Sequence, residues 1–228
     1  MGNGRPGPQR WLDVGPERIE PWLVSFTARH GHTDMTIDDR REIVMARAAD
    51  GSSAECHVPF PPLAARLRGT GADLAAHAGA DRTVGVLLVR LGGYAAGVFA
   101  GPDQQLVASK VGSRLVHGRS AAGGQSQHRF ARRREKQASE ALAAAADTAA
   151  RVLVPYLGRL DALVLGGDKR AMTGMSADPR LRPLFDLATD RFLTVPDPRL
   201  AVLRATPPMY LAVQIKLSET GPGITARS

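Results

Sequence analysis

The chain has 228 residues, of which 43% are hydrophobic and 23% are charged, and this is the composition of a globular protein large enough to bury a hydrophobic core. Its one cysteine, Cys56, excludes a disulfide framework, and its six scattered histidines form no cluster at metal-ligand spacing. The sequence has neither an apolar signal segment at its start nor an uncharged apolar run long enough to span a bilayer, so we expect a cytoplasmic protein that is not embedded in a membrane.

The N-terminal third contains a few short predicted elements. Residues 1–10 are rich in glycine and proline and are expected to be disordered. We treat residues 11–80 as an N-terminal appendage. Its pattern predicts a helix over PERIEPWLVSFTARHG (16–31), a hairpin over REIVMARAADGSSAECHVPF (41–60) with its turn at Asp50-Gly51, a short helix over PPLAARLRG (61–69) and an alanine-rich connection over ADLAAHAGAD (72–81).

The rest of the chain is more regularly patterned. RTVGVLLVRLGGYAAGVFAG (82–101) and QQLVASKVGSRLVHG (104–118) predict three strands in an antiparallel meander. After a long helix to about Leu157, the pattern predicts a strand (161–167), a helix (179–189), a strand (191–196), a helix (197–205) and a last helix or strand (209–217). Residues 81–217 are therefore expected to form an α/β domain with a mixed β-sheet and helices on its faces, followed by a disordered tail over 218–228.

The net charge of +8 is concentrated in one segment. From Lys110 to Lys136 there are eight lysines and arginines and one acid, Glu135, which gives 8 − 1 = +7, so the other 201 residues carry only +1. Such a concentration is typical of a surface that contacts a polyanion, above all the phosphates of a nucleic acid. The alternative interpretation is an ordinary charged helix face exposed to water.

The long helix is predicted to be buried along only half of its length. Its C-terminal half has an apolar stripe at helical spacing, made of Leu142, Ala145, Ala149, Val152 and Tyr156. Between Arg129 and Gln137 the only apolar residues are Phe130 and Ala131, so we expect about two turns to project beyond the domain. The stretch GRSAAGGQSQ (118–127) is then a loop at the tip of this projection.

Glycine and glutamine are the notable residues of this loop. Gly123-Gly124 allows backbone angles that other residues rarely adopt and has no side chains, which suits a loop that enters a confined space, whereas Gly166-Gly167 is interpreted as an ordinary turn. The amide of Gln125 or Gln127 can orient a water or bind a carbonyl, although it cannot act as a base near pH 7. These residues favour hydrolysis that depends on positioning a nucleophile and stabilising developing charge.

The stretch AAGGQSQHRFARRR (121–134) resembles the signature of the Vms-like release-factor (VLRF) family, in particular its short actinobacterial branch. That family is related to the central domain of the eukaryotic class-I peptide release factor, whose tip carries Gly-Gly-Gln. The resemblance covers about residues 80–217 and implies a peptidyl-tRNA hydrolase with a central-domain-like fold and no metal or organic cofactor. Such an enzyme inserts its loop into the peptidyl transferase centre of the large ribosomal subunit and releases stalled nascent chains independently of stop codons.

The resemblance also implies roles for individual residues. Gln127 is favoured as the residue that positions water, because the family places its key glutamine slightly later than the literal Gly-Gly-Gln and beside a serine, here Ser126. Gln125, which completes the literal motif, is the alternative, and Gly123 and Gly124 let the tip enter the ribosomal cavity. Contacts with rRNA or tRNA phosphates are assigned to Arg114, Arg119, His128, Arg129, Arg132, Arg133, Arg134 and Lys136.

Other functions remain as alternatives at this point. A non-catalytic ribosome- or RNA-binding factor would dock through the same basic loop and helix, and an RNA nuclease would use His117 or His128 as a base. A serine hydrolase built on Ser126 and His128 is disfavoured, because the sequence has no nucleophile elbow and no orienting acid nearby. For the favoured hydrolase, the expected partners are large-subunit rRNA and peptidyl-tRNA.

Overall fold

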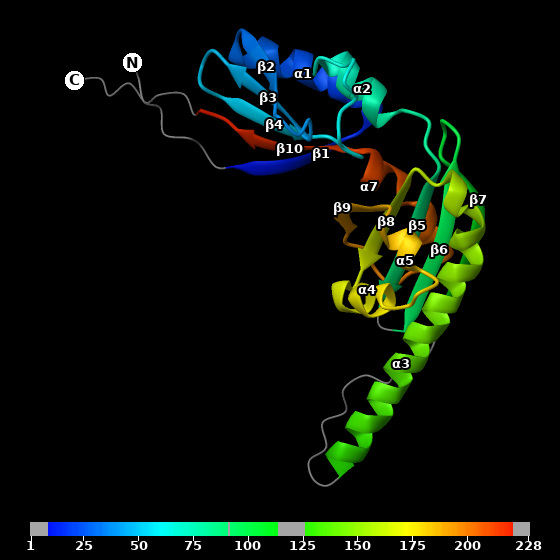
Figure 1. Ribbon diagram of the computed structural model, residues 1–228. Helices are drawn as coiled ribbons and strands as arrows, with labels where there is room; N and C mark the ends of the chain where they lie inside the picture. Colours follow the sequence, from blue (N-terminus) through cyan, green and yellow to red (C-terminus); the bar gives the residue numbers. More distant parts are fainter. Residues whose placement is uncertain (1–8, 91, 114–125, 221–228) are drawn as a thin grey trace. The chain divides into compact units, whose positions relative to one another are not determined.

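The computed structural model describes residues 9–90, 92–113 and 126–220, with the backbone alone for residues 126–134. The chain divides into two compact units, Asp81–Tyr210 and the combination of Met1–Ala80 with Leu211–Ser228 (Figure 1). We call the first the central unit and the second, which contains both ends of the chain, the terminal unit. Within the described residues, no helix is both long enough and apolar enough to cross a membrane.

The terminal unit is built on a five-stranded antiparallel sheet with the strand order β1-β10-β4-β3-β2. On one face of this sheet, Ile19 and Phe26 of the first helix share a buried core with the strand residues Val44 and Ile215. The elements of the unit are β1 (Arg10–Val14), α1 (Pro16–His30), β2 (Thr33–Ile37), β3 (Ile43–Ala48), β4 (Ser53–His57), α2 (Gly71–Ala78) and β10 (Val213–Ser218).

Two predictions for the terminal unit are confirmed and one is wrong. The helix over 16–31 corresponds to α1, and the hairpin over 41–60 corresponds to β3 and β4. No helix is described over 61–69, where the Arg41 guanidinium donates hydrogen bonds to the carbonyl oxygens of Leu63, Ala64 and Leu67 and so holds the segment in a non-helical form. The helix forms later, as α2, because Thr70 and Asp73 cap its first turn reciprocally, with two hydrogen bonds of 3.1 Å.

The boundaries of the predicted domains also differ from those of the structure. The final strand was expected to belong with residues 81–217, whereas β10 pairs with β1 and β4, so that Ile215 lies opposite both Leu12 and Cys56. Strands β1 and β2 were not predicted, and Arg10 and Ser218 lie in strands rather than in disordered ends. Residues 1–8 and 221–228 lie outside the described part of the chain.

The central unit has the predicted mixed sheet, and its strand order is β7-β6-β5-β8-β9. The pairs β5–β6 and β6–β7 are antiparallel and form the expected meander, while β8 is parallel to both β5 and β9. The strands are β5 (Val84–Arg90), β6 (Gly93–Ala100), β7 (Gln105–Ser113), β8 (Ala162–Gly167) and β9 (Ala188–Leu193). The α/β fold class and the mixed sheet are therefore confirmed.

Helices cover the central sheet. They are α3 (Ser126–Leu153), a short 3-10 helix (Val154–Arg159), α4 (Lys169–Ser176), α5 (Arg182–Phe185), α6 (Leu200–Arg204) and α7 (Pro207–Leu211). The apolar stripe predicted for α3 packs as expected, with Ala145, Ala149 and Val152 buried. The helix predicted over 179–189 is reduced to the four residues of α5, and α4 was not predicted, because the pair Gly166-Gly167 was interpreted as a turn.

Gly167 ends β8 and is required by the backbone at that point. Its φ is +102°, and an added Cβ would collide with the carbonyl oxygen of Val89 on the neighbouring strand. We expect Gly167→Ala to lower the free energy of unfolding by about 2–3 kcal/mol, because alanine is strained at this φ and has no space for its methyl group. Urea denaturation of the variant and the wild type measures this difference in the free energy of unfolding.

Gly158→Ala is the matched control, because a Cβ at Gly158 would meet nothing within 4 Å. Equal unfolding midpoints for the two alanine variants would contradict the close approach at Gly167.

Candidate nucleic-acid interface

Four strands of the central sheet end at the same edge. Because β5 and β8 are parallel and β7 is antiparallel to β6, the chain leaves Arg90, Ser113, Gly167 and Leu193 at one edge, which we call the carboxyl edge. The segment between β7 and α3 therefore starts at this edge. The basic segment identified in the sequence thus begins where the parallel strands end, which is the edge at which ligands bind in open α/β sheets.

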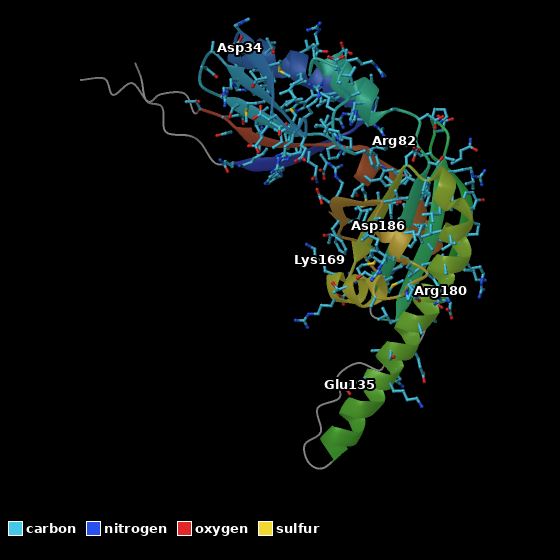
Figure 2. The ribbon with its side chains drawn as sticks, viewed as in Figure 1. Asp34, Arg82, Glu135, Lys169, Arg180 and Asp186 are labelled. Carbon is cyan, nitrogen blue, oxygen red and sulfur yellow. The ribbon has the colours of Figure 1, made fainter. Side chains whose placement is uncertain are left out.

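Helix α3 extends beyond the carboxyl edge. Its 28 residues make it about 42 Å long, and Figure 1 shows that it runs along the sheet and continues past it. Buried side chains begin at Ala145, and Leu142 is partly buried, whereas the described side chains from Glu135 to Glu140 are exposed except Gln137, which is half-buried. Figure 2 shows Glu135 on the extended part. The predicted projection of the N-terminal half of this helix is confirmed.

The predicted site residues are described to different extents. Gln127 is the second residue of α3, so its backbone lies in the first helical turn, and His128 and Arg129 follow in the same turn. Side chains from 126 to 134 are outside the described part of the structure. Arg114, His117, Arg119, Gly123, Gly124 and Gln125 lie wholly outside the described residues.

Most of the predicted basic positions in α3 lie on one face of the helix. Positions 129, 132, 133 and 136 follow the spacing i, i+3, i+4, i+7 and so share one face of α3, whereas position 134 falls on another face. The Lys136 side chain is 80% exposed, and its Nζ lies 4.0 Å from Oε1 of Glu140. An exposed pair of this kind contributes little, so this ammonium can exchange its partner for a phosphate.

The start of α3 has an electrostatic property that matters for chemistry. The first turn of any α-helix has backbone N–H groups without intrahelical acceptors, and it is the positive end of the helix dipole. Both features stabilise an anion placed at the helix start. Gln127 lies within this turn and Gln125 lies before it, so the two candidate glutamines differ in their relation to the helix.

Sequence analysis interpreted the glycine pair before Lys169 and Arg170 as an ordinary turn and not as a phosphate-binding loop, because the Walker pattern is absent. Lys169 and Arg170 are the first residues of α4, and both are exposed. The signal was present in the sequence as Asp168-Lys169-Arg170, a helix-capping aspartate followed by two cations directly after a buried strand.

Elsewhere in the described residues, Cys56 and His57 make packing and pairing contacts that do not indicate a reactive site. Cys56 is fully buried in β4, and burial raises the pKa of its thiol to about 12, so it stays protonated and unreactive. His57 contacts Glu55 through Nε2 at 3.0 Å, which is a surface polar pair. No group of three or more His, Cys, Asp or Glu residues suited to a metal ion occurs in the part of the chain that the structure describes.

Comparison with known proteins identifies a family. The family model described as "Actinobacteria/chloroflexi VLRF1 release factor" matches residues 82–216, which is more than half of the chain. No curated protein matches the sequence.

Solved structures give more distant similarities. The crystal structure of the archaeal translation termination factor aRF1 is 12% identical, with a TM-score of 0.42, over 91% of this chain and 68% of that one. A structure described only as an archaeal protein is 14% identical, with a TM-score of 0.33, over 88% of this chain and 64% of that one.

Proposed function

The chain belongs to the actinobacteria/chloroflexi VLRF1 release factor family, and we propose that it is a peptidyl-tRNA hydrolase that acts on the large ribosomal subunit. In this proposal the central unit inserts the loop that contains Gly123, Gly124 and Gln127 into the peptidyl transferase centre and releases stalled nascent chains. Release factors act in translation, so membership in this family supports the general role. The hydrolysis and the insertion are our proposal.

The projecting helix is the observation that carries the proposal. A hydrolase that reaches an ester deep in an RNA cavity needs a narrow element ahead of its folded domain, and α3 extends beyond the carboxyl edge with exposed side chains along its described part. Its basic positions provide the charge to contact the RNA backbone, and these contacts orient the tip without reading sequence. Insertion of the loop therefore requires no opening of the central unit.

The proposed reaction depends on positioning. The Gln127 amide orients a water toward the carbonyl carbon of the peptidyl ester, and the N–H groups at the start of α3 favour the negative charge that develops on the carbonyl oxygen. The new C–O bond forms as the bond to the tRNA ribose breaks. The proton of the water reaches the departing ribose oxygen through the adjacent ribose hydroxyl, so no protein base is required.

The helix boundary supports Gln127 over Gln125. As the second residue of α3, Gln127 has its backbone fixed by the helix, whereas Gln125 lies outside the described residues. A group that positions a nucleophile must be held in a defined geometry, since displacement of about 1 Å can cost about 10²-fold in rate. We therefore assign the positioning of water to Gln127 and a supporting contact to Gln125.

A release assay tests this proposal against its alternative, a non-catalytic factor that docks through the same loop and helix. Purified protein is mixed with large subunits that carry peptidyl-tRNA, and free peptide and bound protein are both quantified. The hydrolase is expected to release peptide without any codon in the assay. Stable binding without peptide release would favour the non-catalytic factor. Peptidyl-tRNA free in solution is the control, and we expect it to remain intact.

A further inference from the structure

The start of α4 is held in a fixed position at the carboxyl edge. The backbone N–H of Asp168 donates to the carbonyl oxygen of Val89 at 2.7 Å, which ties the beginning of the helix to β5. The Asp168 carboxylate caps α4 by accepting hydrogen bonds from the N–H groups of Arg170, at 2.8 Å, and Ala171, at 3.5 Å. Lys169 and Arg170 therefore extend from a defined backbone, and the acid nearest to them in sequence serves as the helix cap.

Helix α4 also lies against α3 at the point where the projection begins. A Cβ on Gly174 would come within 2.7 Å of Cδ2 of Leu142, the partly buried residue at which α3 meets the central unit. Just beyond α4, the Arg180 guanidinium bridges Asp147 of α3, at 2.8 Å, and Asp178, at 2.6 Å. These contacts hold the C-terminal half of α4 and the segment after it against α3, while the start of α4 lies at the carboxyl edge.

Lys169 and Arg170 have no acidic partner among the described side chains. Both are exposed, and no ion pair joins either to a carboxylate in the described ranges, in contrast to Arg180. The Lys169 Nζ lies 5.4 Å from the centroid of the Phe192 ring on β9. An ammonium beside an aromatic face still has N–H donors that do not point at the ring, so this contact orients the ammonium and leaves it able to bind an anion. Figure 2 shows Lys169 pointing away from the body of the central unit.

We propose that Lys169 and Arg170 form a second contact with the phosphate backbone of ribosomal RNA, at the carboxyl edge beyond which the projecting helix extends. RNA is favoured over an acidic protein because none of the exposed large hydrophobic residues of the described chain belongs to α4, and protein interfaces usually have an apolar centre. The pair continues the charge of α3 onto the folded body of the central unit. This inference rests on the proposed function, in which α3 enters the ribosome, and it adds a docking surface to that site.

The test compares two double variants. Lys169→Ala/Arg170→Ala removes the proposed contact, and Arg151→Ala/Arg204→Ala removes two other exposed arginines. Arg151 lies near the opposite edge of the sheet, where Leu153 approaches Gly85 at the start of β5, and Arg204 ends α6. Affinity for large subunits is measured as a function of salt. The first variant is expected to bind about tenfold more weakly. Its plot of log K against log salt should be shallower, with a slope smaller in magnitude by about 1.5–2, because two phosphate contacts are lost. The control is expected to keep the wild-type values.

Equal affinities and slopes for the two double variants and the wild type would overturn the inference. Unfolding midpoints of all three proteins exclude a loss of fold as the cause, and Lys169→Arg/Arg170→Lys, which keeps both charges, should bind as the wild type does. A photocrosslinker at Thr173, an exposed residue one turn after Lys169 on the same helix face, identifies the partner. Crosslinks to ribosomal RNA support the inference, and crosslinks only to tRNA or to a ribosomal protein overturn it.

These measurements separate this inference from the proposed hydrolysis. If the wild type binds but releases no peptide, the hydrolysis fails while the α4 contact can still be demonstrated by its salt slope. If the wild type releases peptide and the Lys169/Arg170 variant binds normally, the hydrolysis stands and the α4 contact fails.

Discussion

Gln127→Ala is expected to reduce the rate of peptide release by about 10²–10³, while binding to the large subunit persists. The reason is that removal of one preorganised polar contact to the reacting group typically costs about that factor. We expect the substitution to leave the fold of the central unit intact, because position 127 lies in the part of α3 that extends beyond the sheet. The loss should therefore appear in the maximal rate at saturating subunits and not in the concentration needed for half-saturation.

Gln125→Ala is the matched control for this prediction. It removes the same side chain two residues earlier, before the first residue of α3, and it should cost much less. If Gln125→Ala shows the large loss and Gln127→Ala the small one, the glutamine of the literal Gly-Gly-Gln motif positions the water. The proposed ester hydrolysis still holds in that case. If neither substitution slows release, the positioning of water by this loop is wrong.

The triple variant Arg132→Ala/Arg133→Ala/Arg134→Ala is expected to bind large subunits much more weakly, with a salt slope lower by about 2–3. Each arginine that neutralises a phosphate displaces bound cations from the RNA, so the loss of three such contacts changes both the affinity and its dependence on salt. Folding should be nearly unchanged, because alanine is the best helix former and, among the described side chains of α3, the first buried one is Ala145.

The helix geometry also predicts different effects for the three single arginine substitutions. Positions 132 and 133 share a face with 129 and 136, whereas 134 lies on another, so Arg134→Ala alone should change the salt slope less than Arg132→Ala or Arg133→Ala does. Binding titrations at several salt concentrations measure all of these variants. Wild-type affinity together with a wild-type slope for the triple variant would refute the assignment of this helix to RNA contact.

The central unit could be predicted well from its sequence because its signals are local. The apolar runs of β5, β6 and β8 are interrupted by glycine pairs, and the stripe from Leu142 to Val152 has helical spacing, so strand and helix types follow from short windows. Helix α4 was not predicted because it lacks such local signals. Its eight residues have little periodicity, and they follow a glycine pair of the kind found in turns.

The terminal unit was predicted less well because its sheet depends on distant pairing. Strand β10 joins β1 across the whole length of the chain, with Arg10 opposite Leu217, and no local pattern identifies such a partner. The short strands β1 and β2 have only five residues each and become strands through their neighbours. Residues 61–69 show the converse, since a pattern of helical type is held in a non-helical form by hydrogen bonds from the distant Arg41 side chain.

For the candidate site, the sequence identified the basic motif and the projecting helix, whereas the elements around them required the structure. The basic run and the Gly-Gly-Gln-Ser-Gln stretch stand out in composition, and the projection of α3 follows from the absence of apolar residues near its start. The contribution of Lys169 and Arg170 could not be predicted, because only the parallel pairing of β8 with β5 brings the start of α4 to the carboxyl edge.

The chemical state of the two products tests the central claim most directly. After incubation of the protein with large subunits that carry peptidyl-tRNA, the released peptide and the tRNA are analysed by mass. Hydrolysis of the ester predicts a peptide that ends in a free carboxylate and a full-length tRNA with an intact 3′ end. A peptide that still carries nucleotides, together with a shortened tRNA, would contradict this account and would show that the protein cuts RNA instead.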